Sequence, residues 1–200
     1  MKRINKILIL VVFILSFAVS SSFGQIADKG KFSGRLIGGG LALTGANSNN
    51  TTAGPTFGGS IAYGIGNGFA LFAESGYGYT HNNSGNNVQL RQIPIIGGVT
   101  YNLGNFINSS VIQPYIGVAA GAYLLRLRTD GNPVFVSGIE QDATNFGAKA
   151  LLGVNFKLNN DWSFEIYGNY THIFDKNGDP GIESSEFNTV GFGAGLSYAF

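Results

Sequence analysis

The sequence has 200 residues, of which 44% are hydrophobic and 12% are charged, and its formal net charge is +1. A charged share this far below the ~25% of ordinary soluble domains argues against a soluble domain, and the near-neutral balance excludes the basic stripe that nucleic-acid binding needs. The chain has no cysteine, so it contains no disulfide and no thiolate metal site.

The first 24 residues have the order of a secretory signal peptide. Three basic residues precede the apolar stretch 7–19, and Ser22 and Gly24 then suit the −3 and −1 positions of a cleavage site. An N-terminal membrane helix is the alternative, but that stretch is shorter than the about 20 residues a spanning helix needs. We expect residues 1–24 to be removed and residues 25–200 to form one domain. Its formal charge would be −2, because three of the twelve basic residues and none of the eleven acidic ones lie in the signal.

Eight stretches of alternating apolar and small or polar residues follow, and a period of two predicts β-strands. They span residues 31–43, 55–65, 69–79, 88–103, 111–128, 145–158, 162–174 and 188–200. Each is long enough to cross a bilayer as a tilted strand, which takes about 9 to 11 residues. Pro94 and Pro114 lie inside two of them, so each requires a bulge or a position where no backbone donor is needed.

The last stretch indicates which solvent the strands face. Val190, Phe192, Leu196, Tyr198 and Phe200 share one face, while the other face carries glycine, serine and alanine. Lipid favours a bulky apolar face and a narrow lumen favours a small one, so the pattern is typical of a membrane-spanning barrel.

The connections alternate in length. Long polar segments follow the first, third, fifth and seventh stretches, and short turns such as 66–68 follow the second, fourth and sixth. Outer-membrane barrels have short periplasmic turns and long outer loops. This asymmetry predicts that both termini lie on the periplasmic side.

The aromatic residues of the lipid-facing side gather at the strand ends, as in the two interfacial girdles of membrane barrels. A soluble β-sandwich, which is the alternative fold, would not sort them in this way. The predicted inner girdle contains Phe32, Phe69, Tyr101, Phe156, Trp162, Tyr198 and Phe200, and the outer girdle contains Phe57, Tyr77, Tyr79, Phe146 and Tyr170.

The opposite face carries the few charges in the middle of strands, which are Arg35, Glu74, Lys149, Lys157 and Glu165. Unpaired buried charges cost several kcal/mol, so we expect Arg35, Glu74, Lys149 and Glu165 to form a charge network inside the lumen. The lumen of an eight-stranded barrel is just wide enough for side chains to fill. A polar plug of salt bridges is therefore favoured over a path for protons or ions, which remains the alternative.

Residues 175–186 resemble a calcium-binding loop. Oxygen ligands occupy its positions 1, 3, 5, 9 and 12, which are Asp175, Asn177, Asp179, Glu183 and Glu186. Position 6, where the motif has glycine for a sharp turn, is Pro180. An acidic, turn-rich outer loop without a metal is the favoured interpretation.

His172 lies at the outer end of the seventh stretch, close in sequence to Asp175 and Ser184. Some outer-membrane barrels carry catalytic groups at this rim. No recognisable spacing of a nucleophile and a base is present, however, so catalysis is not expected.

The terminal Tyr198-Ala-Phe200 is similar to the C-terminal signature of bacterial outer-membrane barrels, which implies recognition by the barrel assembly machinery. The mature chain resembles the small barrels of the OmpA transmembrane domain, OmpX and opacity-protein type. Its glycine-rich, cysteine-free composition and the signal ending S-F-G-Q resemble porin-family barrels of the Bacteroidota. The resemblance implies a Gram-negative outer membrane, with its lipid and lipopolysaccharide as neighbours and a possible extracellular ligand at the outer loops.

The sequence thus predicts an all-β, eight-stranded, antiparallel up-and-down transmembrane barrel without a cofactor. The expected role is a non-enzymatic one, structural or through surface interactions of the outer loops. A narrow channel for small solutes or ions is the first alternative, and a lipid A-modifying enzyme at the rim is the second.

Overall fold

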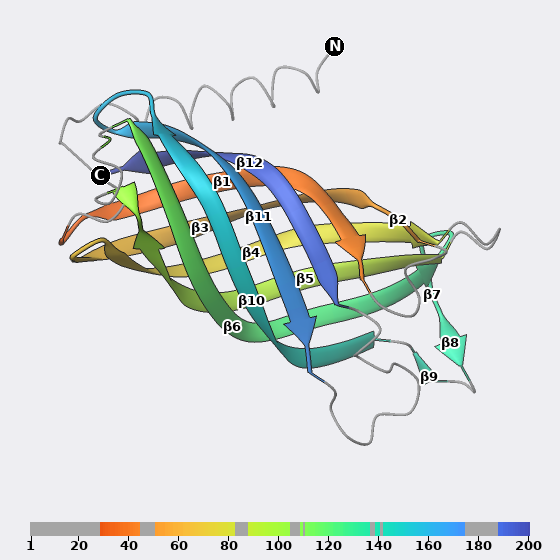
Figure 1. The fold of residues 1–200 in the computed structure, drawn as a ribbon. Coiled ribbons are helices and arrows are strands. Elements are labelled where there is room, and N and C mark those ends of the chain that lie inside the picture. The colour runs from red at the N-terminus through yellow and green to blue at the C-terminus, as the bar shows by residue number, and fades with distance from the viewer. Residues whose placement is uncertain are drawn as a thin grey trace, which may run out of the picture.

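A computed structural model describes residues 29–44, 51–82, 88–104, 109, 111–136, 139–140, 142–174 and 188–200 of the chain. Within these ranges eight long strands dominate, and each predicted stretch is confirmed with its ends within three residues of those observed. The strands are β1 (Phe32–Leu43), β3 (Gly54–Gly66), β4 (Phe69–Asn82), β5 (Val88–Asn102), β6 (Ile112–Thr129), β10 (Asp142–Lys157), β11 (Trp162–Ile173) and β12 (Thr189–Ala199) (Figure 1). Short strands lie at their outer ends: β2 (Thr51–Thr52), β7 (Asn132–Pro133), β8 (Phe135–Val136) and β9 (Ile139–Glu140).

The long strands form a closed antiparallel barrel. Each pairs with the next long strand along the chain, and β12 pairs back with β1. The amide of Phe200 donates to the carbonyl of Phe32 at 2.9 Å, so the last residue lies beside the start of β1. We call this the inner end of the barrel and the opposite one the outer end. The predicted fold class is confirmed.

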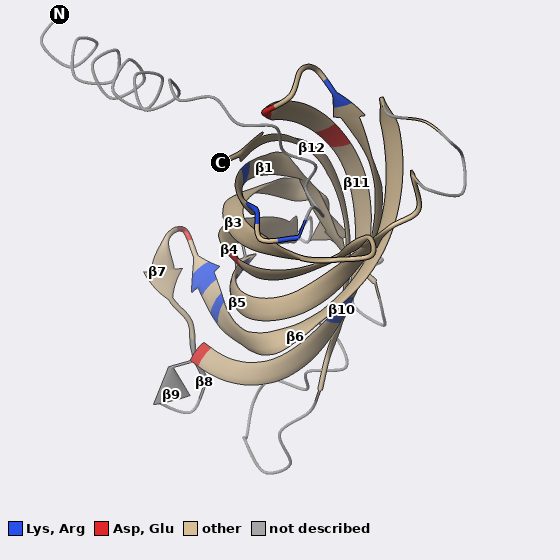
Figure 2. Ribbon diagram, turned by 90° about the vertical axis from the view of Figure 1, so that its left-hand side faces the viewer, with Lys and Arg blue, Asp and Glu red and all other residues tan. Residues whose placement is uncertain are grey.

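The outward face of the wall is apolar and the inward face is not. Leu36, Ile61, Leu152 and Phe192 point outward from four strands, and each is more than 60% exposed. Their sequence neighbours point into the lumen because successive side chains of a strand alternate between the two faces. Charged residues are sparse along the strands (Figure 2). Among the described residues, no helix is long and apolar enough to cross a bilayer.

The two prolines occupy positions that need no donor, as predicted. Pro94 lies where the β4–β5 ladder is interrupted between Ser75–Ile95 and Gly78–Gln92, with no change of register. Pro114 lies one residue beyond the last pair of β5 and β6, and its carbonyl accepts from the amide of Leu103 at 2.7 Å. Neither proline therefore breaks the wall.

The predicted tight turn joins β3 and β4. Asn67 and Gly68 have φ values of 53° and 84°, as the two central residues of a type I′ hairpin turn require.

Aromatic rings contact one another at both ends of the wall. At the inner end, Phe69 packs on Tyr101 and Trp162 on Tyr198, with centroid distances of 4.5 and 4.9 Å. At the outer end, Phe57 packs on Tyr77 at 5.6 Å. The predicted girdle residues thus meet across neighbouring strands, and the barrel presents an apolar band between two aromatic belts.

Candidate functional site: the lumen

Arg35 is the centre of the polar interior. It points into the lumen from β1, and Ser60 on β3 and Glu74 on β4 follow it in one hydrogen-bonded row of the sheet. Its Nε donates to Ser60 Oγ at 2.9 Å, and its Nη2 donates to Glu74 Oε2 at 2.8 Å. Three adjacent strands therefore bring these side chains together.

Glu165 approaches the same guanidinium from the other side. Arg35 Nη1 donates to both carboxylate oxygens of Glu165, at 3.2 and 3.3 Å. Tyr115 on β6 donates its hydroxyl hydrogen to Glu165 Oε2 at 3.2 Å from across the lumen. Gly195 leaves the space for this carboxylate, because a Cβ there would lie 2.8 Å from Glu165 Oε1.

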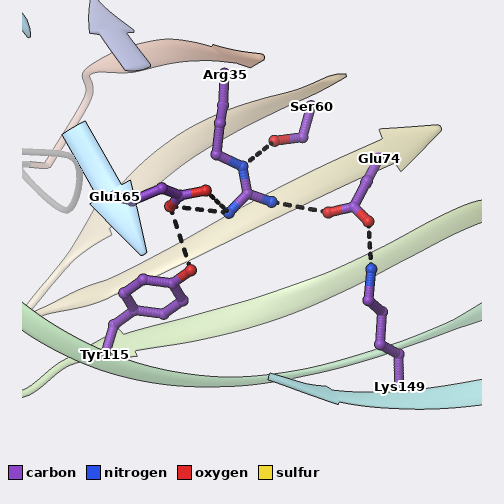
Figure 3. Close-up of polar contacts among 6 residues, drawn as sticks. All are labelled: Arg35, Ser60, Glu74, Tyr115, Lys149 and Glu165. Carbon is purple, nitrogen blue, oxygen red and sulfur yellow. Dashed lines mark hydrogen bonds and ion pairs between the residues drawn. The ribbon is translucent and has the colours of Figure 1, made fainter. Parts of the chain in front are cut away.

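Lys149 completes the group by donating from Nζ to Glu74 Oε1. Arg35, Ser60, Glu74, Tyr115, Lys149 and Glu165 form what we call the lumen network (Figure 3). It contains two cations and two carboxylates, so its formal charge is zero. Glu165 is 1% exposed and Glu74 is 5% exposed.

Burial of these charges explains why the pairing must be complete. Removing an ion from water costs several kcal/mol, which a partner offsets only with good geometry and further hydrogen bonds. Each carboxylate here receives more than one donor: Glu74 from Arg35 and Lys149, Glu165 from Arg35 and Tyr115. The arrangement holds charge in place across the barrel, and both cations are already engaged by carboxylates.

A cavity lies between the network and the inner end. It has about 510 Å³ of space, including the part open to solvent. Polar side chains line much of it, among them Ser33, Asn102 and Asn155, and Arg35 and Glu165 lie at its deep end. We call it the inner vestibule.

A second space, the outer chamber, lies on the opposite side of the network. It measures about 490 Å³ on the same basis, and Glu74, Lys149, Gln92 and Thr189 are among its lining residues. Gln92 Oε1 and Thr189 Oγ1 are buried there without a hydrogen-bond partner among the described residues. Buried polar atoms ordinarily bond to protein or water, so the chamber favours hydration.

Apolar side chains pack in the lumen toward the outer end, in addition to the predicted polar plug. Leu43, Leu90, Leu125 and Ile173 belong to one buried cluster, and we call these four residues the apolar ring. Leu125 is 0% exposed. Beyond the outer chamber, the packed side chains of this ring leave little space for solvent.

The predicted site residues fall into three groups. Arg35, Glu74, Lys149 and Glu165 are brought together in the network. Lys157 lies near the inner end of β10 and forms no ion pair with any residue that the structure describes. The calcium-loop candidates Asp175, Asn177, Asp179, Glu183 and Glu186 lie outside the described residues, as do the signal 1–24 and Ser184, and these remain predictions.

The two histidines lie on the outward side of the wall. His172 is packed edge-on against Phe174 at 4.9 Å, and His81 against Tyr79 at 5.1 Å. Both belong to the outer aromatic belt rather than to the mouth of the lumen. Tyr198 and Phe200 pack on each other at 6.1 Å in the inner belt.

Sequence reasoning missed Ser60, Tyr115 and the apolar ring. Ser60 was detectable in principle, since it alternates onto the lumen face between two strands that carry Arg35 and Glu74. Tyr115 follows Pro114, where the register was unknown. The ring residues are apolar on a face assigned to polar groups, so no local signal marked them.

Comparison with known proteins agrees with this geometry. A model of the outer membrane protein β-barrel domain matches residues 10–200. The chain belongs to this family. Because the family consists of outer-membrane barrels, the location of this protein is the outer membrane. No curated protein sequence matches the chain.

Solved barrels share the fold of this family member at low sequence identity. Neisserial surface protein A has a TM-score of 0.60 and 16% identity, over 84% of this chain and 97% of that one. Ail, the attachment invasion locus protein of Yersinia pestis, has a TM-score of 0.55 and 9% identity over 86% and 99%. The N-terminal barrel of Pseudomonas aeruginosa OprF has a TM-score of 0.51 and 14% identity over 86% and 100%.

Proposed function

We propose that this protein is a closed, non-enzymatic barrel of the outer membrane that acts structurally or through its outer loops. The observation that carries the proposal is the lumen network. It crosses the barrel from β1 to β10 and β11, and its charges are neutralised within it. A solute would have to break buried ion pairs to pass.

The apolar ring supports the same conclusion from the outer half. A hydrated ion that left the outer chamber would lose water among Leu43, Leu90, Leu125 and Ile173, and an unpaired charge in apolar surroundings is costly. The protein therefore has two barriers in series, one of ion pairs and one of packed side chains.

Single-channel recording tests the proposal. The mature barrel, refolded in detergent and inserted into planar bilayers, should give no discrete current steps. A known open porin in the same bilayers is the positive control. Current steps in the wild type that change in Arg35→Ala or Glu74→Ala would contradict the closed barrel and support the second candidate function, a narrow channel.

One observation favours this second candidate function. The inner vestibule and the outer chamber lie on either side of the network: Arg35 and Glu165 line the vestibule, and Glu74 and Lys149 line the chamber. A rearrangement of the network alone would join the two spaces. Uptake of small sugars by vesicles that contain the barrel, measured by swelling, would detect a pore too brief for clear current steps.

The non-enzymatic part of the proposal rests on the position of the histidines. His172 packs in the outer aromatic belt against Phe174, and both predicted partners of His172 lie outside the described residues. Lipid A from cells with and without the protein should have the same mass spectrum. A difference abolished by His172→Ala would show a rim enzyme instead.

The proposed orientation has both termini in the periplasm and the long connections outside. It is supported by the shared end of Phe32 and Phe200 and by the tight Gly66–Gly68 turn at that same end. In this arrangement residues 1–24 direct export, and Tyr198 and Phe200 contact the assembly machinery. Membrane-impermeant labelling of single cysteines placed at Asn67 and Asp130 should modify only position 130 in intact cells.

A further inference from the structure

Two arginines lie side by side on the outward face of the wall. Arg91 on β5 is paired with Arg126 on β6, Tyr79 on β4 is next to Arg91, and Asp142 on β10 is next to Arg126. These four residues form one cross-strand row at the outer end, which we call the arginine row. Figure 2 shows basic residues at the end of β6 beside an acidic residue at the start of β10.

The row lies at the boundary of the apolar band. The next outward residues toward the inner end are Ile93 on β5, Leu124 on β6 and Thr144 on β10, followed by Ile95 and Phe146, which are exposed. Tyr79 contacts Tyr77 and His81 in the outer aromatic belt. Aromatic belts mark the level of the lipid headgroups. Arg91 and Arg126 therefore lie at headgroup depth.

The charges of the row are not balanced within it. Like charges directly opposite on neighbouring strands repel. Within the described part of the chain, the acid beside them is Asp142, which is already shared by Arg126 at 3.5 Å and Arg128 at 2.7 Å. Asp130 lies farther out, at the turn that follows β6.

Arg91 in particular has unused donors. Its Nη2 donates only weakly to Gln89 Oε1, at 3.4 Å, and its Nε is buried without a hydrogen-bond partner among the described residues. The guanidinium of Arg126 is half-exposed beside it. Two guanidinium groups side by side at one level match the oxygens of a phosphate, which arginine binds in bidentate fashion.

We propose that the arginine row binds the phosphate of an outer-leaflet lipid, with Arg91 and Arg126 as the donors. Acyl chains of that lipid would lie along the apolar band below, where Ile95 and Phe146 are exposed. The inference rests on the proposed orientation for its placement in the outer leaflet, but the binding chemistry does not depend on whether the lumen conducts.

Binding of purified lipid A by the refolded, detergent-solubilised barrel tests the inference. Native mass spectrometry should detect one tightly held bis-phosphorylated lipid A, and Arg91→Gln with Arg126→Gln should weaken its binding about tenfold, as expected for loss of charged hydrogen bonds. The matched control, Lys29→Gln with Lys31→Gln, removes the same charge at the inner end and should bind as the wild type does.

Three results would overturn the inference. They are equal binding of chemically dephosphorylated lipid A, unchanged binding by the double arginine variant, and an equal loss in the lysine control. Displacement by millimolar inorganic phosphate would reassign the row to a free anion. Arg128 still pairs with Asp142 in the double variant, which favours folding, and the single variants Arg91→Gln and Arg126→Gln carry the test if the double variant fails to fold. A silent or conducting lumen changes none of these outcomes, so failure here is separate from failure of the proposed function.

Discussion

The inner and outer halves of the lumen close the same barrel by different physics. The inner half uses the lumen network, where each carboxylate has a specific set of donors and a cavity opens behind it. The outer half uses the apolar ring, where Leu125 and Ile173 are almost fully buried with no polar partner to satisfy. The stability of the ion-pair network depends on every charged member, whereas the stability of the apolar ring depends on the volume that its side chains fill.

This difference predicts which substitutions destabilise the barrel most. Loss of one partner in a buried ion pair leaves an uncompensated charge, and the cost exceeds that of the contact itself. Loss of one apolar side chain leaves a cavity that neighbours can partly fill. The two halves should therefore respond differently to substitutions of similar size, and the following variants are ordered by their expected effect.

Opening both barriers together should have the largest effect. Arg35→Ala combined with Leu125→Ala removes the centre of the network and one ring residue, so the inner vestibule, the outer chamber and the outer mouth become continuous. Planar-bilayer recordings should then show steps that exceed the sum of the single variants. Silence of the double variant would mean that another part of the chain closes the lumen.

Arg35→Ala alone should be the most destabilising single change. It leaves Glu165 buried with only the Tyr115 hydroxyl as donor, and breaking a buried pair in this way costs about 3 to 5 kcal/mol. Urea unfolding of the barrel in lipid vesicles, followed by the fluorescence of Trp162, the single tryptophan, measures the change. A loss below 1 kcal/mol would indicate that the network contributes little to stability.

Leu125→Ala should cost less, about 2 to 4 kcal/mol, because it deletes a fully buried side chain but strands no charge. The same unfolding experiment provides the measurement. If it exceeds the effect of Arg35→Ala, the contrast between the two halves is wrong.

Tyr115→Phe should lower the free energy of unfolding by about 1.5 kcal/mol, the lower end of what a hydrogen bond to a charged group contributes, because the contact is long at 3.2 Å. The ring remains, so packing is preserved and only the donor to Glu165 is lost. Tyr63→Phe, which changes the hydroxyl of an exposed ring packed on Phe32 at the inner end, is the comparison. An equal loss in both variants would show that the Glu165 contact has no special weight.

Lys157→Gln should be nearly neutral, within about 0.5 kcal/mol, as for substitutions away from buried networks. It shares the lumen face with Lys149 but lies near the inner end without an ion pair to any described residue. Lys149→Gln, which breaks the contact with Glu74, should be clearly destabilising. Equal effects would mean that position along the lumen does not matter.

Local patterns were enough to predict the wall. Alternation from Val190 to Phe200 reports the solvent on each face, and lipid demands a bulky apolar residue at every second position. The same alternation places Arg35, Glu74, Lys149 and Glu165 in the lumen. Strand number, strand ends, girdles and the inward direction of these charges therefore followed from the sequence.

The contacts inside the lumen depended on the tertiary structure. Lys149 meets Glu74 although they are 75 residues apart, and Tyr115 meets Glu165 although they are 50 apart. Such meetings are set by the stagger of strands around the closed wall, which no single strand encodes. For the same reason only the folded barrel revealed that Leu43, Leu90, Leu125 and Ile173 converge. The alternation within one strand determines which face each side chain occupies, but closure of the barrel determines which side chains meet across the lumen.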